Sequence, residues 1–263
     1  QSTVVTKYSP NGNALEEENI LGIKSSVKFG YDENLAYAVA GNAGHESILF
    51  ESYENVYGSE LEDHLQIQAG TSVSSIASHT GYASLKFASG STSPFFISTA
   101  MPFTPQIQNN GLHAKLWIHN IDESSESLNA VIRDVSTGTS VSSSLNKVAR
   151  TGEWVLYELN YTNWGAFAPA EFEVRLNIEN SSSGKDFHVD DVRIQPMDAE
   201  MVCYVYDYRN FRLMATLDDQ HFALLYQYNA EGQLTRKMVE TVRGIKTITD
   251  GQYNLPVKNR IIN

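Results

Sequence analysis

The sequence is 263 residues long and 41% hydrophobic, and its 19 Lys and Arg residues stand against 31 Asp and Glu residues, for a formal charge of −12. This hydrophobic fraction is enough for a packed core, which excludes wholesale disorder. The acidic balance argues against nucleic acid as a partner, because phosphates are bound mainly through basic surfaces; it suits a cation or a neutral glycan. No run of 18 apolar residues is present, so we expect no membrane-spanning segment.

Alternating strand patterns dominate the chain. Seven runs alternate apolar and polar residues, or end an apolar run at a turn cluster. They cover residues 25–31, 83–89, 113–121, 128–135, 153–161, 172–180 and 187–194. Few stretches show helical periodicity. We therefore predict an all-β fold.

Four zones follow from where these strands lie. Residues 1–45 form an N-terminal strand segment, and residues 46–197 hold most of the alternating strands. Residues 198–254 are rich in tyrosine, and residues 255–263 read as a tail. The number and spacing of the strands in 46–197 suit two antiparallel sheets packed face to face, a jelly-roll β-sandwich.

The single cysteine limits the chemistry of the chain. Cys203 has no partner for an intrachain disulfide, and it rules out a cysteine-rich metal site. It stands in a strand-like run, so we expect a buried core thiol, with a reactive thiol as the other interpretation. Secreted bacterial proteins also exist without disulfides, so the location stays open.

The middle zone resembles a known family. "LFESYENV" at 49–56, "ASHTGYASLKFAS" at 77–89, "GEWVLYEL" at 152–159 and "KDFHVDDVRI" at 185–194 follow one another in a recurrent order. That order is similar to the galactose-binding-like jelly rolls, the fold of many carbohydrate-binding modules. The resemblance implies a jelly roll and a neutral glycan as a candidate ligand.

The same resemblance implies at most one cofactor, a structural calcium ion. Such jelly rolls often hold calcium between an early Glu and an Asp of the last strand, here Glu51 or Glu54 with Asp190 or Asp191. Calcium takes 6–8 oxygen ligands, so carbonyls near Gly81 would contribute. Alternation places Glu51 and Glu54 on opposite faces of a regular strand, so one ligand of the two is expected. The other interpretation is that these are solvated or hydrogen-bonded carboxylates.

Aromatic residues supply the candidate glycan site. Trp117 and Trp154 lie in alternating strands and are expected in the core. Trp164 differs, because it sits with Tyr161 and Phe167 in a loop of aromatic and turn residues. We expect these three rings to pack the loop itself; the other interpretation is a stacking platform for a sugar or a partner protein.

The sequence gives no sign of an enzyme. A glycosidase needs two carboxylates facing each other across a cleft, and nothing in the pattern pairs two of them. No nucleophile elbow, zinc-binding helix or phosphate loop is present. The histidines are scattered, and His79 is expected to be a hydrogen-bonded structural residue.

Two segments near the end repeat each other. "YVYDYRNFRL" at 204–213 and "YQYNAEGQL" at 226–234 share an alternating Tyr pair, a turn and a Leu, and Tyr206 and Tyr228 lie 22 residues apart. Both resemble the YD repeat of the RHS family, and "FGYDENL" at 29–35 is a weaker echo. Such repeats form hairpin ribbons, so the tyrosines are expected to be structural.

Together these motifs resemble long RHS-type surface proteins of Bacteroidota that carry a jelly roll beside a YD ribbon. The resemblance implies a non-enzymatic structural or interaction module of a bacterial outer-surface or secreted assembly, associated with the outer membrane. Its partners would be other subunits or domains of that assembly. The alternative is a carbohydrate-binding module that recognises a neutral glycan.

Overall fold

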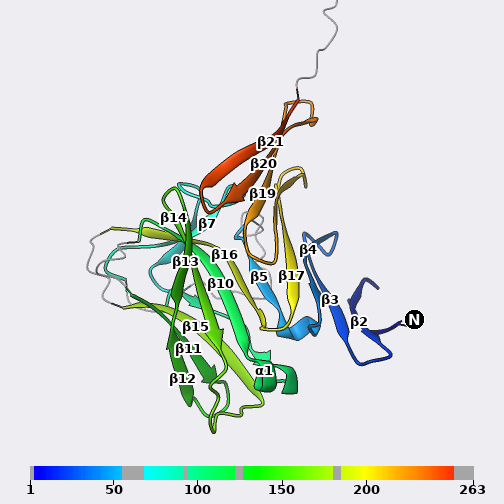
Figure 1. Cartoon of the computed structure of the whole chain (residues 1–263), viewed down its shortest axis with the longest axis vertical. Coiled ribbons are helices and arrows are strands. Elements are labelled where there is room, and N and C mark those ends of the chain that lie inside the picture. Colours follow the sequence, from blue (N-terminus) through cyan, green and yellow to red (C-terminus); the bar gives the residue numbers. More distant parts are fainter. Residues whose placement is uncertain (1–2, 55–67, 92–93, 122–126, 180–184, 252–263) are drawn as a thin grey trace, which may run out of the picture.

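Three stacked β-sheets make up nearly all of the computed structural model, which describes residues 3–54, 68–91, 94–121, 127–179 and 185–251 (Figure 1). The predicted tail at 255–263 and the last residues of the 198–254 segment lie outside this range. Within the described residues no helix is long and apolar enough to cross a membrane.

Two of the sheets form the predicted jelly-roll sandwich. The larger has the strand order β13-β14-β10-β16-β7-β6, with β5 also paired to β16. Its strands are β5 (Leu49–Glu51), β6 (Thr71–Ser74), β7 (Ser84–Phe87), β10 (Leu112–His119), β13 (Asn146–Thr151), β14 (Trp154–Tyr161) and β16 (Phe187–Pro196). The smaller sheet contains β8 (Phe96–Ile97), β9 (Met101–Pro102), β11 (Ser127–Asp134), β12 (Ser140–Ser144) and β15 (Glu171–Glu179).

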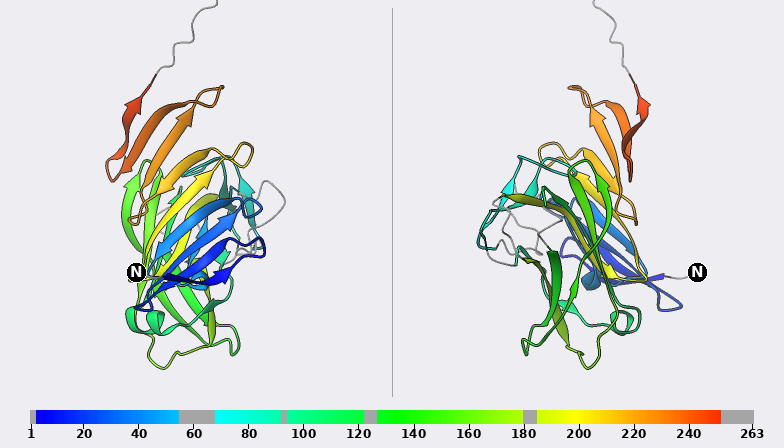
Figure 2. Two further views of the ribbon diagram at one scale, coloured as in Figure 1. Left: turned by 90° about the vertical axis from the view of Figure 1, so that its right-hand side faces the viewer. Right: turned by 60° about the vertical axis from the view of Figure 1, so that its left-hand side comes forward.

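The third sheet joins the two ends of the described chain. It runs β1 (Thr3–Tyr8), β2 (Ala14–Asn19), β3 (Lys24–Gly30), β4 (Leu35–Gly41), β17 (Glu200–Tyr206), β18 (Leu213–Leu217), β19 (Ala223–Tyr228), β20 (Leu234–Thr241) and β21 (Gly244–Asp250). Adjacent strands are antiparallel, and β4 pairs directly with β17, with Gly41 opposite Glu200. The two predicted ribbons are therefore one sheet, and the jelly roll is an insertion between β4 and β17 (Figure 2).

Within the described residues all seven predicted strands are present, with Asn180 at the end of one of them outside that range, and the all-β fold is confirmed. The described part of the chain also contains two short helices that the sequence pattern does not predict, η1 (His45–Ser47) and α1 (Pro105–Asn110). Thr104 caps α1 by accepting a hydrogen bond from the Ile107 N–H at 3.2 Å, and proline occupies the first turn. Six residues are too few to show a helical period, which is why only the cap and the proline mark this helix.

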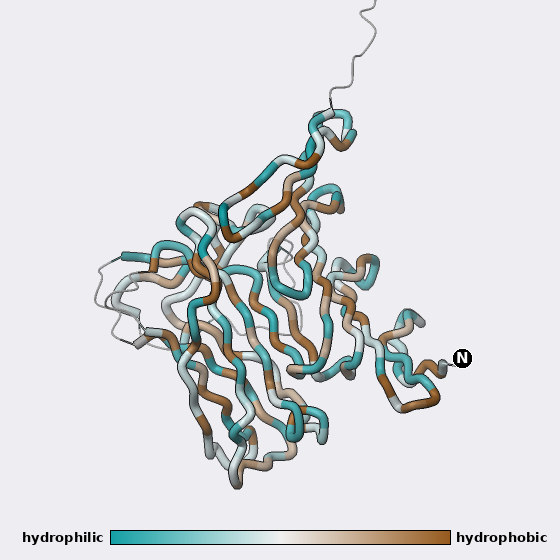
Figure 3. The backbone as a smooth tube through the Cα atoms, viewed as in Figure 1, coloured by the Kyte–Doolittle hydropathy of each residue, from teal (hydrophilic) through white to brown (hydrophobic). Residues whose placement is uncertain are grey.

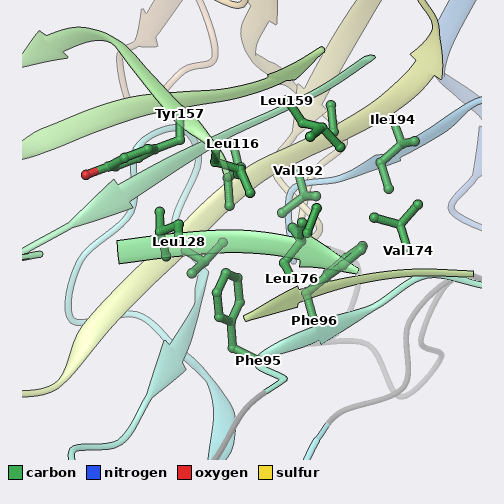
Figure 4. Close-up of a cluster of buried hydrophobic side chains, with 14 of the residues drawn as sticks. Phe95, Phe96, Leu116, Leu128, Tyr157, Leu159, Val174, Leu176, Val192 and Ile194 are labelled. Atoms are coloured by element: carbon green, nitrogen blue, oxygen red, sulfur yellow. The ribbon is translucent and has the colours of Figure 1, made fainter. Parts of the chain in front are cut away.

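The main core lies between the two jelly-roll sheets. Along β10 the residues Leu112, Ala114, Leu116 and Ile118 all face this core and are buried, so period-two alternation decides which side chains enter it. Figure 4 shows Leu116 within this core. From the smaller sheet, Phe172, Val174 and Leu176 of β15 pack into the same core. Each fully buried side chain of this kind contributes roughly 1.5–3 kcal/mol. Hydropathy alternates along the strands accordingly (Figure 3).

A bulge in β16 changes which residues face that core. Val189 and Val192 both reach it although they are three residues apart, because the register with β10 shifts between Lys115 and Trp117. Asp191 occupies the extra position with a φ of 51°. The bulge therefore brings Asp190 and Asp191 together at one place, fully buried.

The nine-stranded sheet reuses one turn. Ser9, Asn19, Asp218 and Asn229 each donate a backbone N–H to the carbonyl four residues later. The position three residues on has positive φ and is Gly12, Gly22 or Gly232 in three of these turns, as a hairpin with a bulge requires. In the fourth turn this position is His221, with a φ of 73°.

The repeated tyrosines bind the nine-stranded sheet together. The Tyr31 hydroxyl donates to the Tyr206 carbonyl, and the Tyr206 hydroxyl donates to the Ala36 carbonyl, both at 3.1 Å. The Tyr228 hydroxyl donates to the Leu213 carbonyl at 2.9 Å. The N-terminal echo and the first C-terminal repeat thus touch each other, and the predicted structural role of the tyrosines is confirmed.

The nine-stranded sheet covers the outer face of the larger jelly-roll sheet. Arg193 of β16, 1% exposed, crosses this interface and donates to the carbonyls of Met201, Asp218 and Asp219 at 2.9, 2.9 and 2.5 Å. Cys203 is fully buried in the core of the nine-stranded sheet, as expected. The sheet is therefore held by charge-assisted hydrogen bonds as well as by apolar contacts.

Replacing Arg193 should detach the two units. Arg193→Ala leaves three carbonyls without their donor, of which that of Met201 is buried, and we expect the free energy of unfolding to fall by about 3 kcal/mol. Urea denaturation followed by tryptophan fluorescence measures this loss. Arg243→Ala, at an exposed arginine of the β20–β21 turn, is the matched control and should change stability by less than about 0.5 kcal/mol. A loss below about 1 kcal/mol for Arg193→Ala would contradict the anchoring role.

Candidate functional site

Two of the four predicted acidic residues lie at a sharp turn that ends β5. The ladder with β16 reaches Glu51, which pairs with Val192, and Tyr53 then turns the chain with a φ of 61°. The alternation that was expected to separate Glu51 and Glu54 onto opposite faces thus stops at Glu51. Both side chains are buried, at 3% and 0% exposure.

Each of these glutamates has one hydrogen-bonded oxygen and one orphan. Glu51 Oε1 accepts from the Tyr53 N–H at 2.6 Å, and Glu54 Oε1 accepts from the Tyr82 and Ala83 N–H groups at 2.6 and 2.7 Å. The Oε2 atoms of both are buried and have no hydrogen-bond partner in the described structure. Gly81 makes room for Glu54, since a Cβ there would lie 2.2 Å from Oε1.

Asp190 and Asp191 hold the loop that precedes β7. Asp190 Oδ2 accepts from the backbone N–H groups of His79 and Thr80 at 2.7 and 3.3 Å. Asp191 accepts from the Thr80 hydroxyl at 2.9 Å and contacts His79 Nδ1 at 2.7 Å. The bulge in β16 thus positions two adjacent carboxylates against one loop.

His79 connects the acidic residues to the nine-stranded sheet. Its Nδ1 faces Asp191, and its Nε2 lies 2.9 Å from Glu240 Oε1 on β20. The ring stacks on Trp117, with centroids 4.2 Å apart. The expectation of a hydrogen-bonded structural histidine is confirmed.

Burial shifts the protonation of this cluster. Desolvation is the largest cause of the raised pKa values of Glu51, about 7, and Glu54, about 8, and the charge of Asp191 contributes to both. Desolvation also raises the pKa of Asp190 well above its usual value. For His79 burial lowers the pKa, but hydrogen bonds to Asp191 and Glu240 outweigh it and raise the pKa to about 9.

The cluster matches calcium in donor chemistry but not in side-chain count. Two orphan carboxylate oxygens and an excess of buried acids suit a hard cation. Yet no three His, Cys, Asp or Glu side chains of the described residues gather in an arrangement that could hold a metal ion. A calcium ion here would therefore depend on Glu51 and Glu54 together with carbonyl oxygens.

The candidate aromatic platform is part of the core. Trp164 is 6% exposed and donates its Nε1–H to the Ile107 carbonyl at 3.0 Å. Tyr161 is 8% exposed and donates its hydroxyl to the Asn163 carbonyl at 2.8 Å. Phe167 stacks on Trp164 and packs against the same core. The hydrogen bond to Ile107 ties Trp164 to α1, and Phe167 stays half-buried, so the three rings mainly pack the loop.

A pocket of about 460 Å³ opens instead between the jelly roll and the nine-stranded sheet. Strands β13 and β14 and the turn joining them form one wall, and β19, β20 and β21 form the other. Its lining residues are Ser78, His79, His119, Thr151, Gly152, Glu153, Trp154, Ala223, Leu225, Glu240, Gly244 and Ile245. We call this the Trp154 pocket.

Trp154 lines this pocket because of its place on β14. Val155 and Tyr157 face the sandwich core, so Trp154 and Leu156 face outward toward the nine-stranded sheet. Leu156 is fully covered, whereas Trp154, at the strand end, is only partly buried. The sequence reading expected Trp154 in the core; its position beside a turn was the one available signal that it lies at a rim.

Polar groups surround the Trp154 ring. His119 lies 5.2 Å from it between ring centroids, and His119 Nε2 contacts Glu153 Oε2 at 3.0 Å. His119 Nδ1 is buried and has no hydrogen-bond partner among the described residues. The pocket thus combines an aromatic ring with hydroxyl, carboxylate and imidazole side chains, a composition found in small-ligand sites.

A second pocket of about 470 Å³ lies between the N-terminal strands and α1. Its charges are already paired, with Lys7 contacting Glu46 at 2.6 Å and Lys24 contacting Glu16 at 2.8 Å. No aromatic residue is among its lining residues in the described structure. It offers a ligand less than the Trp154 pocket does.

Comparison with known proteins finds similarity to solved structures alone. No family model and no curated protein matches the chain. The CBM22-1 xylan-binding domain of Paenibacillus barcinonensis Xyn10C is 16% identical, with a TM-score of 0.37 over 56% of this chain and 92% of that one. The C-terminal family 22 carbohydrate-binding module of Clostridium thermocellum Xyn10B is 14% identical, with a TM-score of 0.38 over 59% and 97%. The family 30 module of Clostridium thermocellum Cel9D-Cel44B is 13% identical, with a TM-score of 0.37 over 58% and 92%.

These solved structures are carbohydrate-binding modules, but similarity at this level carries no argument about the ligand of this chain. The jelly roll is identified from the arrangement of its two sheets. The resemblance to YD-repeat surface proteins of Bacteroidota has no matching relative and stays an expectation.

Stability should fall with rising pH when calcium is chelated. The pKa values of Glu51, Glu54 and His79 lie above their ordinary values of 4.5, 4.5 and 6.5, so the folded chain holds more protons than the unfolded chain. The stability they contribute is complete below those ordinary values and is lost as pH rises through about 7, 8 and 9. Urea denaturation between about pH 5 and 9 measures the slope. Glu54→Gln should flatten it and the exposed Glu231→Gln should not; a flat wild-type profile would refute the buried, protonated state.

Proposed function

We propose that this chain is a non-catalytic glycan-binding module whose site is the Trp154 pocket. The observation that carries the proposal is a partly exposed tryptophan at the rim of a pocket of about 460 Å³ that hydroxyl and carboxylate side chains also line. A pyranose ring has an apolar face of C–H groups, which packs on an indole ring, and hydroxyl groups at its edge. Those hydroxyls can bond Thr151, Glu153 and His119.

The other candidate function is a structural or interaction module, and the first reason for it no longer holds. It rested on a hairpin ribbon without a partner, but β17 pairs with β4 and the sheet packs on the jelly roll. One observation still favours it: the edge strand β21 is exposed at every position after Gly244, including Ile245 and Ile248. An exposed edge can pair with a strand of another domain or subunit.

The same proposal includes the location. A non-catalytic glycan-binding module fits the extracellular or bacterial cell-surface setting that the RHS-like motifs imply. The single buried cysteine makes folding independent of disulfide formation there. Association with an outer-membrane assembly belongs to this proposal and is testable by fractionation of the native cells.

A structural calcium ion is a further part of the proposal. The orphan Oε2 atoms of Glu51 and Glu54 are buried beside like charges, which a divalent cation would neutralise. The ion would tie the β5 turn to the loop around Gly81. It would be structural, since the cluster lies at the junction of the sheets.

Glycan binding should depend on Trp154. We expect a glycan array to give hits for the wild-type chain, and Trp154→Ala to weaken them by at least about tenfold, since stacking on a ring is worth about 1–3 kcal/mol. Tyr8→Ala removes an aromatic ring that is 63% exposed on β1 and far from the pocket, so it is the matched control and should bind normally. An array without hits, or equal binding by Trp154→Ala, would reject this site.

Calcium should raise the thermal midpoint of the wild-type chain. At about a hundred times the dissociation constant, binding to the folded state adds about 2.7 kcal/mol. Glu51→Gln and Glu54→Gln should each remove the response, because each deletes one of the two orphan carboxylates. Glu231→Gln should retain it. Identical melting curves with calcium and with chelator would end the calcium proposal and leave the glycan site unaffected.

A further inference from the structure

The lining of the Trp154 pocket contains no fixed cationic side chain. Its twelve described lining residues include Glu153 and Glu240 but neither Lys nor Arg. The pocket beside α1 contrasts with it, since Lys7 and Lys24 line that one. A ligand with carboxylate or sulfate groups would therefore meet negative charge in the Trp154 pocket and find no cation to pair with.

Two carboxylates and one histidine ring meet at the floor of the pocket. Glu240 is 3% exposed; its Oε1 contacts His79 Nε2 at 2.9 Å and its Oε2 accepts from the Ala223 N–H at 3.0 Å. His79 Nδ1 contacts Asp191 Oδ2 at 2.7 Å, so the ring lies between two carboxylates. The floor therefore presents carboxylate oxygens and no lysine or arginine side chain.

The rim adds a second carboxylate. The Glu153 side chain is 83% exposed, and its Oε2 contacts His119 Nε2 at 3.0 Å. An ammonium group, with three donors and no acceptor, is complementary to carboxylates that lie beside an aromatic ring.

Building on the proposed glycan-binding function, we infer that the ligand of the Trp154 pocket is a glycan with protonated amines, such as a polymer of de-N-acetylated hexosamine. Its ammonium group lies near Glu153 and over the indole ring, where Coulomb and cation–π attraction add. Neutral glycans of the same backbone bind more weakly. Polyuronates are excluded by Glu153 and by the carboxylates of the floor.

Calorimetry of the full chain with three oligomers of matched length tests this inference: glucosamine, N-acetylglucosamine and galacturonate. At about pH 6, where amines are protonated, and low salt, we expect glucosamine to bind about tenfold more tightly than N-acetylglucosamine, and galacturonate not to bind. Glu153→Gln should reduce that preference to about threefold or less, while Glu231→Gln should retain it.

Each other outcome has a distinct meaning. If the neutral or acidic oligomer binds as tightly as glucosamine, the charge selection is wrong and the glycan site stands. If no oligomer binds here and the array is also empty, the proposed function itself fails. Because the chain carries a formal charge of −12, polycations could also be attracted without a site. Glucosamine binding that survives Trp154→Ala would be that attraction and would overturn the inference.

Discussion

Arg193 is the residue on which the relation between the two units depends. The N–H groups of a buried guanidinium need hydrogen-bond acceptors. Arg193 donates to the Met201 carbonyl of β17 and to the Asp218 and Asp219 carbonyls of the β18–β19 turn. Placing these acceptors around one cation fixes how the sheet lies on β16. That placement in turn brings Glu240 to His79 and closes one wall of the Trp154 pocket. The pocket is thus a product of the docking and would not exist in either unit alone.

The bulge in β16 has a comparable effect on the acidic cluster. One extra residue at Asp191 lets Val189 and Val192 both reach the core while Asp190 and Asp191 reach the loop at His79. Charge therefore accumulates beside an apolar core, which is costly unless protons or a cation compensate. His79 supplies part of that compensation and also spans to the other sheet. The His79 ring consequently belongs both to the acidic cluster, through Asp191, and to the pocket floor, through Glu240.

The sequence predicted the strands well and the assembly poorly, for physical reasons. Alternation and turns are local, so the strands of the sandwich and the repeated tyrosines were found from the pattern. The pairing of Gly41 with Glu200 joins segments separated by the whole jelly roll, and no local pattern reports it. Trp154 was misjudged for the same reason, since its partial exposure depends on where another sheet ends. Trp117 and Trp164 are buried as expected. The acidic residues were found through the family resemblance, but the turn at Tyr53 that buries both glutamates was not.

The ladder between β4 and β17 also has a mechanical consequence. Tension applied between β1 and β21 passes from strand to strand across the nine-stranded sheet and reaches β17 directly from β4. The jelly roll is inserted between the neighbouring strands β4 and β17, so it lies outside this path of force. A force applied along the nine-stranded sheet would therefore load the hydrogen bonds between its strands. The jelly roll would carry little of that force and would stay folded.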